Sequence, residues 1–171
     1  PFGMIYEILI RTGLRKGEVA NLTWDRVNLE EGTLELKAAN TKNSNPTTTP
    51  LPPAVLALLQ EIKPNGPFVF TTNGKTPVSG FSKAEKRLKT MTDISDMRAH
   101  DFRRTFASSL ARLKVQPHVI ESCLNHISGQ ISGVAATYNR YQYFDERKEA
   151  LLRLEGHLFN MAITYNEGVT K

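Results

Sequence analysis

The most informative part of the sequence is residues 100–107, which read His-Asp-Phe-Arg-Arg-Thr-Phe-Ala. The run lies inside the strongest helical pattern of the chain, residues 97–113, because Phe102, Phe106 and Leu110 recur at the spacing of one helix face. The pattern predicts a long amphipathic helix whose apolar face is buried in the core of the domain.

Two polar side chains flank that apolar face. At about 100° per residue, His100 and Arg103 fall within about 60° of each other, so the pattern places both on one rim of the helix. A cation half-sheltered on such a rim attracts a phosphate more strongly than a solvated one, and the N–H groups at the helix start also favour an anion. For an isolated pair, the ordinary interpretation is a capping or core histidine beside a solvated arginine.

The rest of the second half is also helical in pattern. Residues 82–89 form a basic amphipathic segment, residues 117–124 a short helix, and residues 145–158 a charged closing helix with regularly spaced leucines. A flexible Ser/Gly-containing loop, residues 128–133, separates the last two. Residues 164–171 are either a loose tail or an arm that docks on a partner.

The first half mixes helices with extended segments. A helix over residues 2–12 ends at the terminator Gly13, and a second short helix follows over residues 14–22. The period then changes to two over residues 32–37, which with the β-branched residues 47–51 predicts an antiparallel hairpin. Further along lie a proline-started helix at 52–59 and a run at 68–71 that reads as either a buried strand or an anchored loop.

Composition fits one ordinary globular domain. The chain has 171 residues, 40% hydrophobic and 23% charged, which excludes collagen-like, coiled-coil and wholly disordered classes. A formal net charge of +5 and a sequence pI near 9.4 favour a polyanionic partner without naming one. The single cysteine, Cys123, permits no internal disulfide, and neither a membrane span nor a signal peptide is visible. We therefore expect a cytoplasmic protein with no membrane partner.

Other candidate residues are ambiguous when taken singly. Arg15 follows a Thr-Gly-Leu turn, and Glu18 is close enough to brace it on a helix, although such a pair is equally often an ordinary surface ion pair. Lys42 sits at the tip of the predicted hairpin, where most lysines are simply solvated. His126 follows a short helix, and Tyr138 follows the flexible loop; a structural role is the ordinary interpretation of each.

In this order, five segments resemble the catalytic domain of tyrosine recombinases, the phage and prophage integrase family. They are residues 12–19 (Thr-Gly-Leu-Arg-Lys-Gly-Glu-Val), Thr41-Lys42, residues 100–107, residues 124–126 (Leu-Asn-His) and residues 135–140 (Ala-Ala-Thr-Tyr-Asn-Arg). The resemblance spans nearly the whole chain. Its last block, continued through Tyr143 and Glu146-Arg147, looks most like integrases of prophages and genomic islands.

The resemblance implies roles for six residues. Arg15 and Arg103 would hold the scissile phosphate, and Lys42 would be the lysine of the β-hairpin. His100 would be the first histidine of the site, and His126 would occupy the position of the second histidine or tryptophan. Tyr138 would be the nucleophile.

Two positions depart from the commonest family pattern. Asn125 stands where glycine is usual, and Asn43 follows the lysine where threonine is frequent, but neither change removes a reactive group. Tyr141 and Tyr143 are alternative hydroxyls close to Tyr138, and the Tyr-Asn-Arg context favours Tyr138 as the nucleophile.

These residue types also suit phosphodiester cleavage in their own right. Displacement at phosphorus builds negative charge on the nonbridging oxygens, which the permanently charged forks of two arginines can hold. A tyrosine with a pKa of about 10 needs a base, for which His100 is the candidate, and the leaving 5′ oxygen needs a proton, which Lys42 can give. A phosphotyrosine link would conserve the energy of the broken bond, so we expect no cofactor and no metal.

The sequence and the resemblance together predict an α+β fold that is mainly helical, with a small antiparallel sheet near residues 32–51. Residues 1–160 would be the catalytic domain and residues 161–171 a C-terminal tail, with an N-terminal DNA-binding domain missing from the fragment. The partners would be duplex DNA, three further copies in a synaptic tetramer, and accessory DNA-bending proteins. DNA contacts beyond the site would come from Lys86, Arg87 and Arg104. Glu18 would brace Arg15.

The predicted function is site-specific recombination in the cytoplasm of a bacterial host, at the nucleoid, through a 3′-phosphotyrosine intermediate that integrates a prophage or genomic island. Two alternatives share the fold: a DNA-binding module without catalysis, and a type IB topoisomerase that relaxes supercoils. A third alternative, a protein-binding domain with incidental arginines and histidines, would require six ordered matches to arise by chance.

Overall fold

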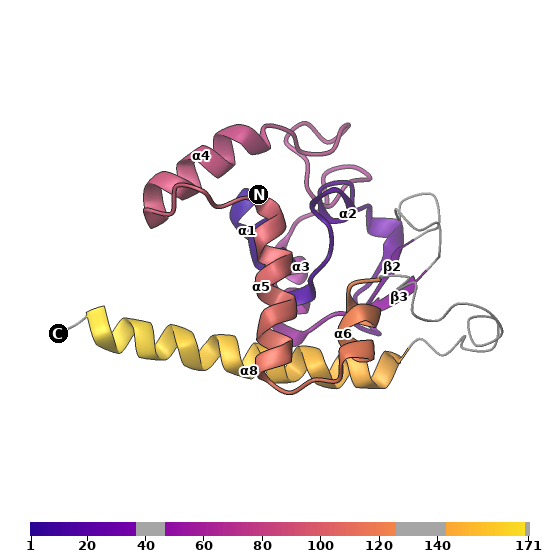
Figure 1. Ribbon diagram of the computed structural model, residues 1–171. Coiled ribbons are helices and arrows are strands. Elements are labelled where there is room, and N and C mark those ends of the chain that lie inside the picture. Colours follow the sequence, from indigo (N-terminus) through magenta and orange to yellow (C-terminus); the bar gives the residue numbers. More distant parts are fainter. Residues whose placement is uncertain (37–46, 126–142, 170–171) are drawn as a thin grey trace, which may run out of the picture.

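Helices make up most of the chain, and a small antiparallel sheet lies near its N-terminal third (Figure 1). The computed structural model describes residues 1–36, 47–125 and 143–169. The helices are α1 (Phe2–Thr12), α2 (Lys16–Ala20), α3 (Pro53–Glu61), α4 (Phe81–Thr92), α5 (Ala99–Arg112), α6 (Pro117–Cys123) and α8 (Phe144–Val169), with a 3-10 turn at Trp24–Arg26. The α+β class predicted from the sequence is confirmed.

The sheet has three strands in the order β1-β2-β3, all antiparallel. They are β1 (Val27–Asn28), β2 (Thr33–Leu36) and β3 (Thr47–Pro50). The pairs Leu36↔Thr47 and Thr33↔Pro50 confirm the predicted partnership of the two extended segments. Strand β1 was not predicted, because two residues are too few to show a period of two.

The turn after α1 is fixed by Gly13. Its φ of 67° is left-handed, and its N–H donates to the Leu9 carbonyl at 3.0 Å, which closes the helix. The Thr12 hydroxyl also turns back, donating to the Ile8 carbonyl at 2.6 Å. A Cβ at position 13 would overlap the ring of Phe106 on α5. Glycine is therefore required here both by the backbone conformation and by the close approach of the two helices.

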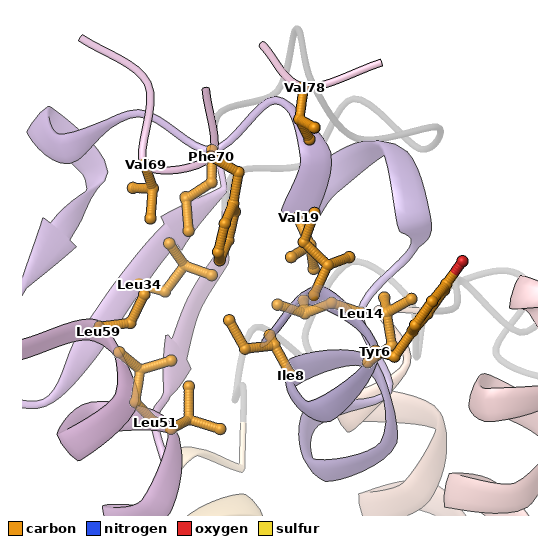
Figure 2. Close-up of a cluster of buried hydrophobic side chains, with 14 of the residues drawn as sticks. Tyr6, Ile8, Leu14, Val19, Leu34, Leu51, Leu59, Val69, Phe70 and Val78 are labelled. Carbon is orange, nitrogen blue, oxygen red and sulfur yellow. The ribbon is translucent and has the colours of Figure 1, made fainter. Parts of the chain in front are cut away.

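Apolar side chains gather in two clusters. The first joins α1, α2, the sheet, α3 and the loop at residues 69–78, and Figure 2 shows its side chains converging from these elements. The second joins α5, α6 and α8. Helix α5 contributes to both, since Ala99 and Phe102 belong to the first cluster, whereas Phe106 and Leu110 belong to the second. The single apolar face predicted for this helix is thus divided between two cores.

The closing helix is longer than predicted. Helix α8 begins at Phe144 and continues to Val169, so residues 161–169, expected as a tail, are helical. The sequence interpretation ended the helix at Leu158, the last of its regularly spaced leucines. The side chains of residues 159–166 are exposed, but no proline interrupts the helix. In Figure 1 this second half of α8 extends past the end of α5.

Two smaller sequence expectations are also resolved. Residues 68–71 are an anchored loop: Phe68 makes one isolated bridge with Thr23, and the Val69 N–H donates to the Leu22 carbonyl at 2.9 Å. The helix expected over residues 14–22 is only the five-residue α2, followed by the 3-10 turn. Within residues 1–36, 47–125 and 143–169, no helix combines the length and the apolar character needed to cross a membrane.

Candidate active site

Arg15 lies at the start of α2, where a buried glutamate fixes it. The Glu18 carboxylate accepts from the Arg15 backbone N–H at 2.7 Å and from Arg15 Nη1 at 2.9 Å. The Glu18 side chain is 3% exposed and that of Arg15 24%, so this is not an ordinary surface pair. Charge-assisted bonds shielded from water are stronger than exposed ones. The bracing role predicted for Glu18 is therefore present in the geometry.

Arg103 lies deeper, between two backbone carbonyls. Its side chain donates through Nη1 to the Gly13 carbonyl and through Nη2 to the Leu124 carbonyl. Burial, together with the positive charge of Arg15, lowers the pKa of Arg103 to about 10, while Glu18 and Glu121 oppose the shift. At pH 7 the guanidinium keeps its charge, since that pH is still well below the lowered pKa.

Arg103 thereby joins two turns that carry other predicted site residues. Gly13 lies two positions before Arg15, and Leu124 lies two positions before His126. Because Arg103 donates to the Gly13 carbonyl, its guanidinium lies beside the turn that leads into Arg15. The described structure thus brings both predicted phosphate-holding arginines to one place, next to the end of α6.

The half-sheltered position predicted for Arg103 beside His100 is wrong. Arg103 is buried, whereas His100 is exposed in the first turn of α5. Helical periodicity gives the angle between two side chains but not their depth. Arg103 is fully enclosed rather than half-sheltered.

Lys42, His126 and Tyr138 lie outside the described residues, but the residues that border their segments meet. Thr47, the first residue after the Lys42 segment, donates its hydroxyl to Asn125 Oδ1 at 3.3 Å. Asn125 has a left-handed φ of 45°, a conformation that asparagine tolerates better than most residues. Asparagine in place of the usual glycine thus fits the turn and adds a bond to β3.

The other border is the start of α8. Arg147 Nη2 donates to the Thr48 carbonyl of β3 at 2.7 Å. Tyr143, just before α8, packs its ring on that of His118 in α6, with the ring centroids 4.8 Å apart. Tyr143 is half-buried in this contact, which gives it a structural role. The start of β3, the end of α6 and the start of α8 therefore lie together.

The residues predicted to contact DNA lie on the surface. Lys86 and Arg87 are exposed on α4, and Arg104 is exposed on α5, where its Nη1 lies 3.3 Å from Asp101 Oδ1. Figure 1 shows α4 near one end of α5 and α8 at the other end. These side chains are accessible, and their role in DNA binding stays a prediction.

Sequence reasoning missed two residues that organise this region, Arg147 and Asn125. Arg147 is 1% exposed. A signal for it existed: it precedes Ala150, Leu151 and Leu154 at intervals of three, four and seven, so it occupies the apolar face of α8. Asn125 was noted only as a departure from glycine. Neither contact with β3 could be read from the sequence, since each joins residues distant along the chain.

Comparison with known proteins identifies the family of this chain. Residues 3–143 match the model of the phage integrase family, and the chain therefore belongs to that family of tyrosine recombinases. Prophage integrase IntZ of Escherichia coli (strain K12) is 32% identical over 146 residues, which is 82% of this chain and 35% of that protein. The chain thus spans about a third of the length of this curated relative.

Solved structures show the same fold. The integrase from mycobacterium phage Brujita superposes with a TM-score of 0.67 at 19% identity, over 89% of this chain and 50% of that one. The XerH site-specific recombinase bound to difH substrate, a pre-cleavage complex, gives a TM-score of 0.60 at 20% identity, over 73% of this chain and 39% of that one.

Proposed function

We propose that this chain is the catalytic part of a site-specific DNA recombinase that cleaves and rejoins strands through a 3′-phosphotyrosine, and that it integrates a prophage or genomic island. The observation that carries the proposal is the position of Arg103, enclosed between the Gly13 and Leu124 carbonyls near Arg15. Two fixed cations at one place suit a phosphate whose nonbridging oxygens gain charge in the transition state. Membership of the integrase family supports the same chemistry.

In the proposed cleavage step, the Tyr138 hydroxyl oxygen attacks phosphorus and the bond from phosphorus to the 5′ oxygen breaks. His100 takes the phenol proton, and Lys42 gives a proton to the departing 5′ oxygen. Arg15 and Arg103 balance the charge of the nonbridging oxygens. Attack by another 5′ hydroxyl on the phosphotyrosine reverses the step and rejoins the strand, so the bond energy is conserved.

The preset positions of the arginines support this assignment. Arg15 is oriented by two bonds to Glu18, and Arg103 by two bonds to backbone carbonyls, so little side-chain reorganisation is needed when a phosphate arrives. Preorganised donors of this kind stabilise a transition state more than mobile ones do. We infer that Glu18 is a positioning residue for Arg15.

Duplex DNA is the proposed substrate. XerH was solved bound to its difH substrate, and the net charge of +5 on this chain favours a polyanion. Lys86, Arg87 and Arg104 are the proposed phosphate contacts outside the site. Because such contacts release counterions, the DNA affinity of the protein should fall steeply as salt rises. An affinity that does not change with salt would contradict this part of the proposal.

The active assembly is proposed to be a synaptic tetramer, with an N-terminal DNA-binding domain ahead of this one and accessory bending proteins at the site. Helix α8 is fixed to its own domain as far as Glu155, whose carboxylate accepts from the Ala54 N–H at 2.7 Å. Beyond it, Phe159 and Tyr165 are exposed. The arm proposed to dock on a neighbouring copy is thus residues 159–171. Gel filtration with paired sites showing only monomers would count against the tetramer.

The test of the function is a trapped covalent complex. Duplexes that bind the full-length protein are first selected from a random-sequence library. They are then made with a nick beside the cleavage position, so that the short fragment released by cleavage diffuses away and cannot be rejoined. Denaturing electrophoresis should then show protein attached to DNA, and Tyr138→Phe should remove that species. No adduct with the wild-type protein would favour the non-catalytic module. Relaxation of plasmids without sequence preference would favour the topoisomerase.

A further inference from the structure

Arg147 is a buried cation with few partners. Its side chain is 1% exposed, and Nε and Nη1 have no hydrogen-bond partner in the part of the chain that the structure describes. In that part of the chain the guanidinium donates one hydrogen bond, from Nη2 to the Thr48 carbonyl at 2.7 Å, and lies over the Phe144 ring, 5.8 Å from its centroid. Burying a charge without a carboxylate partner costs stability, and apolar residues of similar size commonly replace such groups without loss. Stability alone therefore does not account for an arginine at this position.

The bond of Arg147 is made to the edge of the sheet. Strand β3 is the outer strand of the order β1-β2-β3, so one row of its backbone groups faces away from β2. The Thr48 carbonyl that accepts from Arg147 lies one residue after Thr47, the first residue beyond the Lys42 segment. Arg147 thus holds β3, the strand that directly follows the segment containing Lys42 in the sequence.

Helix α8 does not depend on this bond for its own place. Arg153 Nη2 donates to the Leu113 carbonyl at the end of α5, and Glu155 accepts from the Ala54 N–H at the start of α3. Leu151 and Leu154 are buried in the second apolar cluster. If the Arg147 bond were lost, α8 would stay docked, and β3 would be held only by β2 and by the bond from Thr47 to Asn125 among the contacts described above.

Resting on the proposed function, we propose that Arg147 is a positioning residue for Lys42. By fixing β3 against α8, it sets the hairpin relative to the helix that follows Tyr138, so that the proton donor and the nucleophile act on the same phosphate. Displacement of a reacting group by about 1 Å can cost about 100-fold in rate. The role predicts a defect in protonation of the leaving 5′ oxygen, with DNA binding unaffected.

The test compares Arg147→Met, Arg147→Lys and the control Arg153→Met in the full-length protein. Arg153 is also an α8 arginine bonded to a backbone carbonyl, but its partner is α5 and not the hairpin. The rate of adduct formation is measured at saturating DNA on nicked duplexes retained from the random library, with either oxygen or sulfur as the bridging 5′ atom. A thiol has a pKa of about 8.5, so sulfur leaves without a proton donor.

Arg147→Met should slow adduct formation on the oxygen substrate by about 10- to 100-fold, with unchanged DNA affinity, and should regain the wild-type rate on the sulfur substrate. Arg147→Lys, which keeps one donor, should be intermediate, and Arg153→Met should match wild type. A full rate for Arg147→Met, a loss that sulfur does not relieve, or an equal loss for Arg153→Met would each overturn the proposal.

A second measurement does not require cleavage. Backbone amides of Thr47, Thr48 and Thr49 should exchange hydrogen faster in Arg147→Met than in wild type or Arg153→Met, since the edge strand loses its bond to Arg147. Unchanged exchange would overturn the positioning role even if the protein formed no adduct. Absence of any wild-type adduct on both substrates would instead contradict the proposed function, so the two failures are distinguishable.

Discussion

The two apolar clusters differ in what they contribute where they meet. The first, around α1 and the sheet, presents backbone carbonyls, those of Gly13 and Thr48. The second, around α5 and α8, presents the guanidinium groups that bind them, Arg103 and Arg147. Each cluster is filled by non-directional apolar packing, whereas these hydrogen bonds across the junction have strict geometry. We infer from this difference that the hydrogen bonds at the junction fix the orientation of one cluster relative to the other. A catalytic site built from residues of both clusters needs such a fixed orientation.

The largest expected effect is at Arg103. Arg103→Met removes the bond across the junction to Gly13, the bond to Leu124 of the second cluster, and one of the two cations proposed to hold the phosphate. Adduct formation should fall by about 100- to 1000-fold, the range for losing a preorganised donor. The matched control is Arg112→Met, an exposed arginine on the same helix. Equal losses in both variants would show that α5 contributes only positive charge, and that the bonds of Arg103 do not contribute to the rate of adduct formation.

The next effect is on stability, at Gly13. Gly13→Ala places a side chain in a left-handed conformation and against the Phe106 ring, which should lower the free energy of unfolding by about 3 kcal/mol. Gly3→Ala in α1 is the control, since a Cβ there meets nothing, and it should add about 0.5–1 kcal/mol through helix propensity. Urea denaturation measures both. A tolerated Gly13→Ala would mean that the clusters can shift relative to each other.

A smaller effect separates a buried from an exposed ion pair. Glu18→Gln removes the charge that orients Arg15 and should cost about 1–2 kcal/mol of unfolding free energy. Glu7→Gln weakens the exposed pair with Arg11 on α1 and should cost at most about 0.5 kcal/mol. Denaturant midpoints compare the two. Equal costs would show that burial of Glu18 adds nothing to its hold on Arg15.

The smallest change is expected at Cys123, inside the second cluster. Burial raises the pKa of the Cys123 thiol to about 12, so at pH 8 the thiol stays protonated and unreactive. Iodoacetamide at that pH should leave the native protein unlabelled over a time that fully labels the urea-unfolded chain. Labelling of the native protein would show that the second cluster opens more readily than its burial implies.

The sequence predicted the parts of the fold that depend on local signals. The end of α1 at Gly13, helix α5 and the pairing of β2 with β3 follow from a terminator, an apolar period of helix type and an alternating period. The end of α8 was missed because the regularly spaced leucines stop at Leu158, whereas the helix continues to Val169. Periodicity also could not show that α5 serves two clusters.

The sequence predicted which residues form the candidate site, but not how deeply each side chain is buried. Arg15, Glu18 and Arg103 were named from ordered motifs, and the structure gathers them. The enclosure of Arg103, the exposure of His100 and the bonds from Arg147 and Asn125 to β3 depend on contacts between distant segments, which no local pattern contains. The roles of Lys42, His126 and Tyr138 stay predictions.

The most direct test of the central claim is to find which residue carries the DNA. Trypsin cleaves after Lys114, Arg140 and Arg147, so Tyr138 falls on the peptide of residues 115–140, whereas Tyr141 and Tyr143 fall on residues 141–147. Mass spectrometry of the trapped complex, after nuclease trimming, should find the nucleotide phosphate on the first peptide. Finding it on the second peptide, or on neither, would contradict the account.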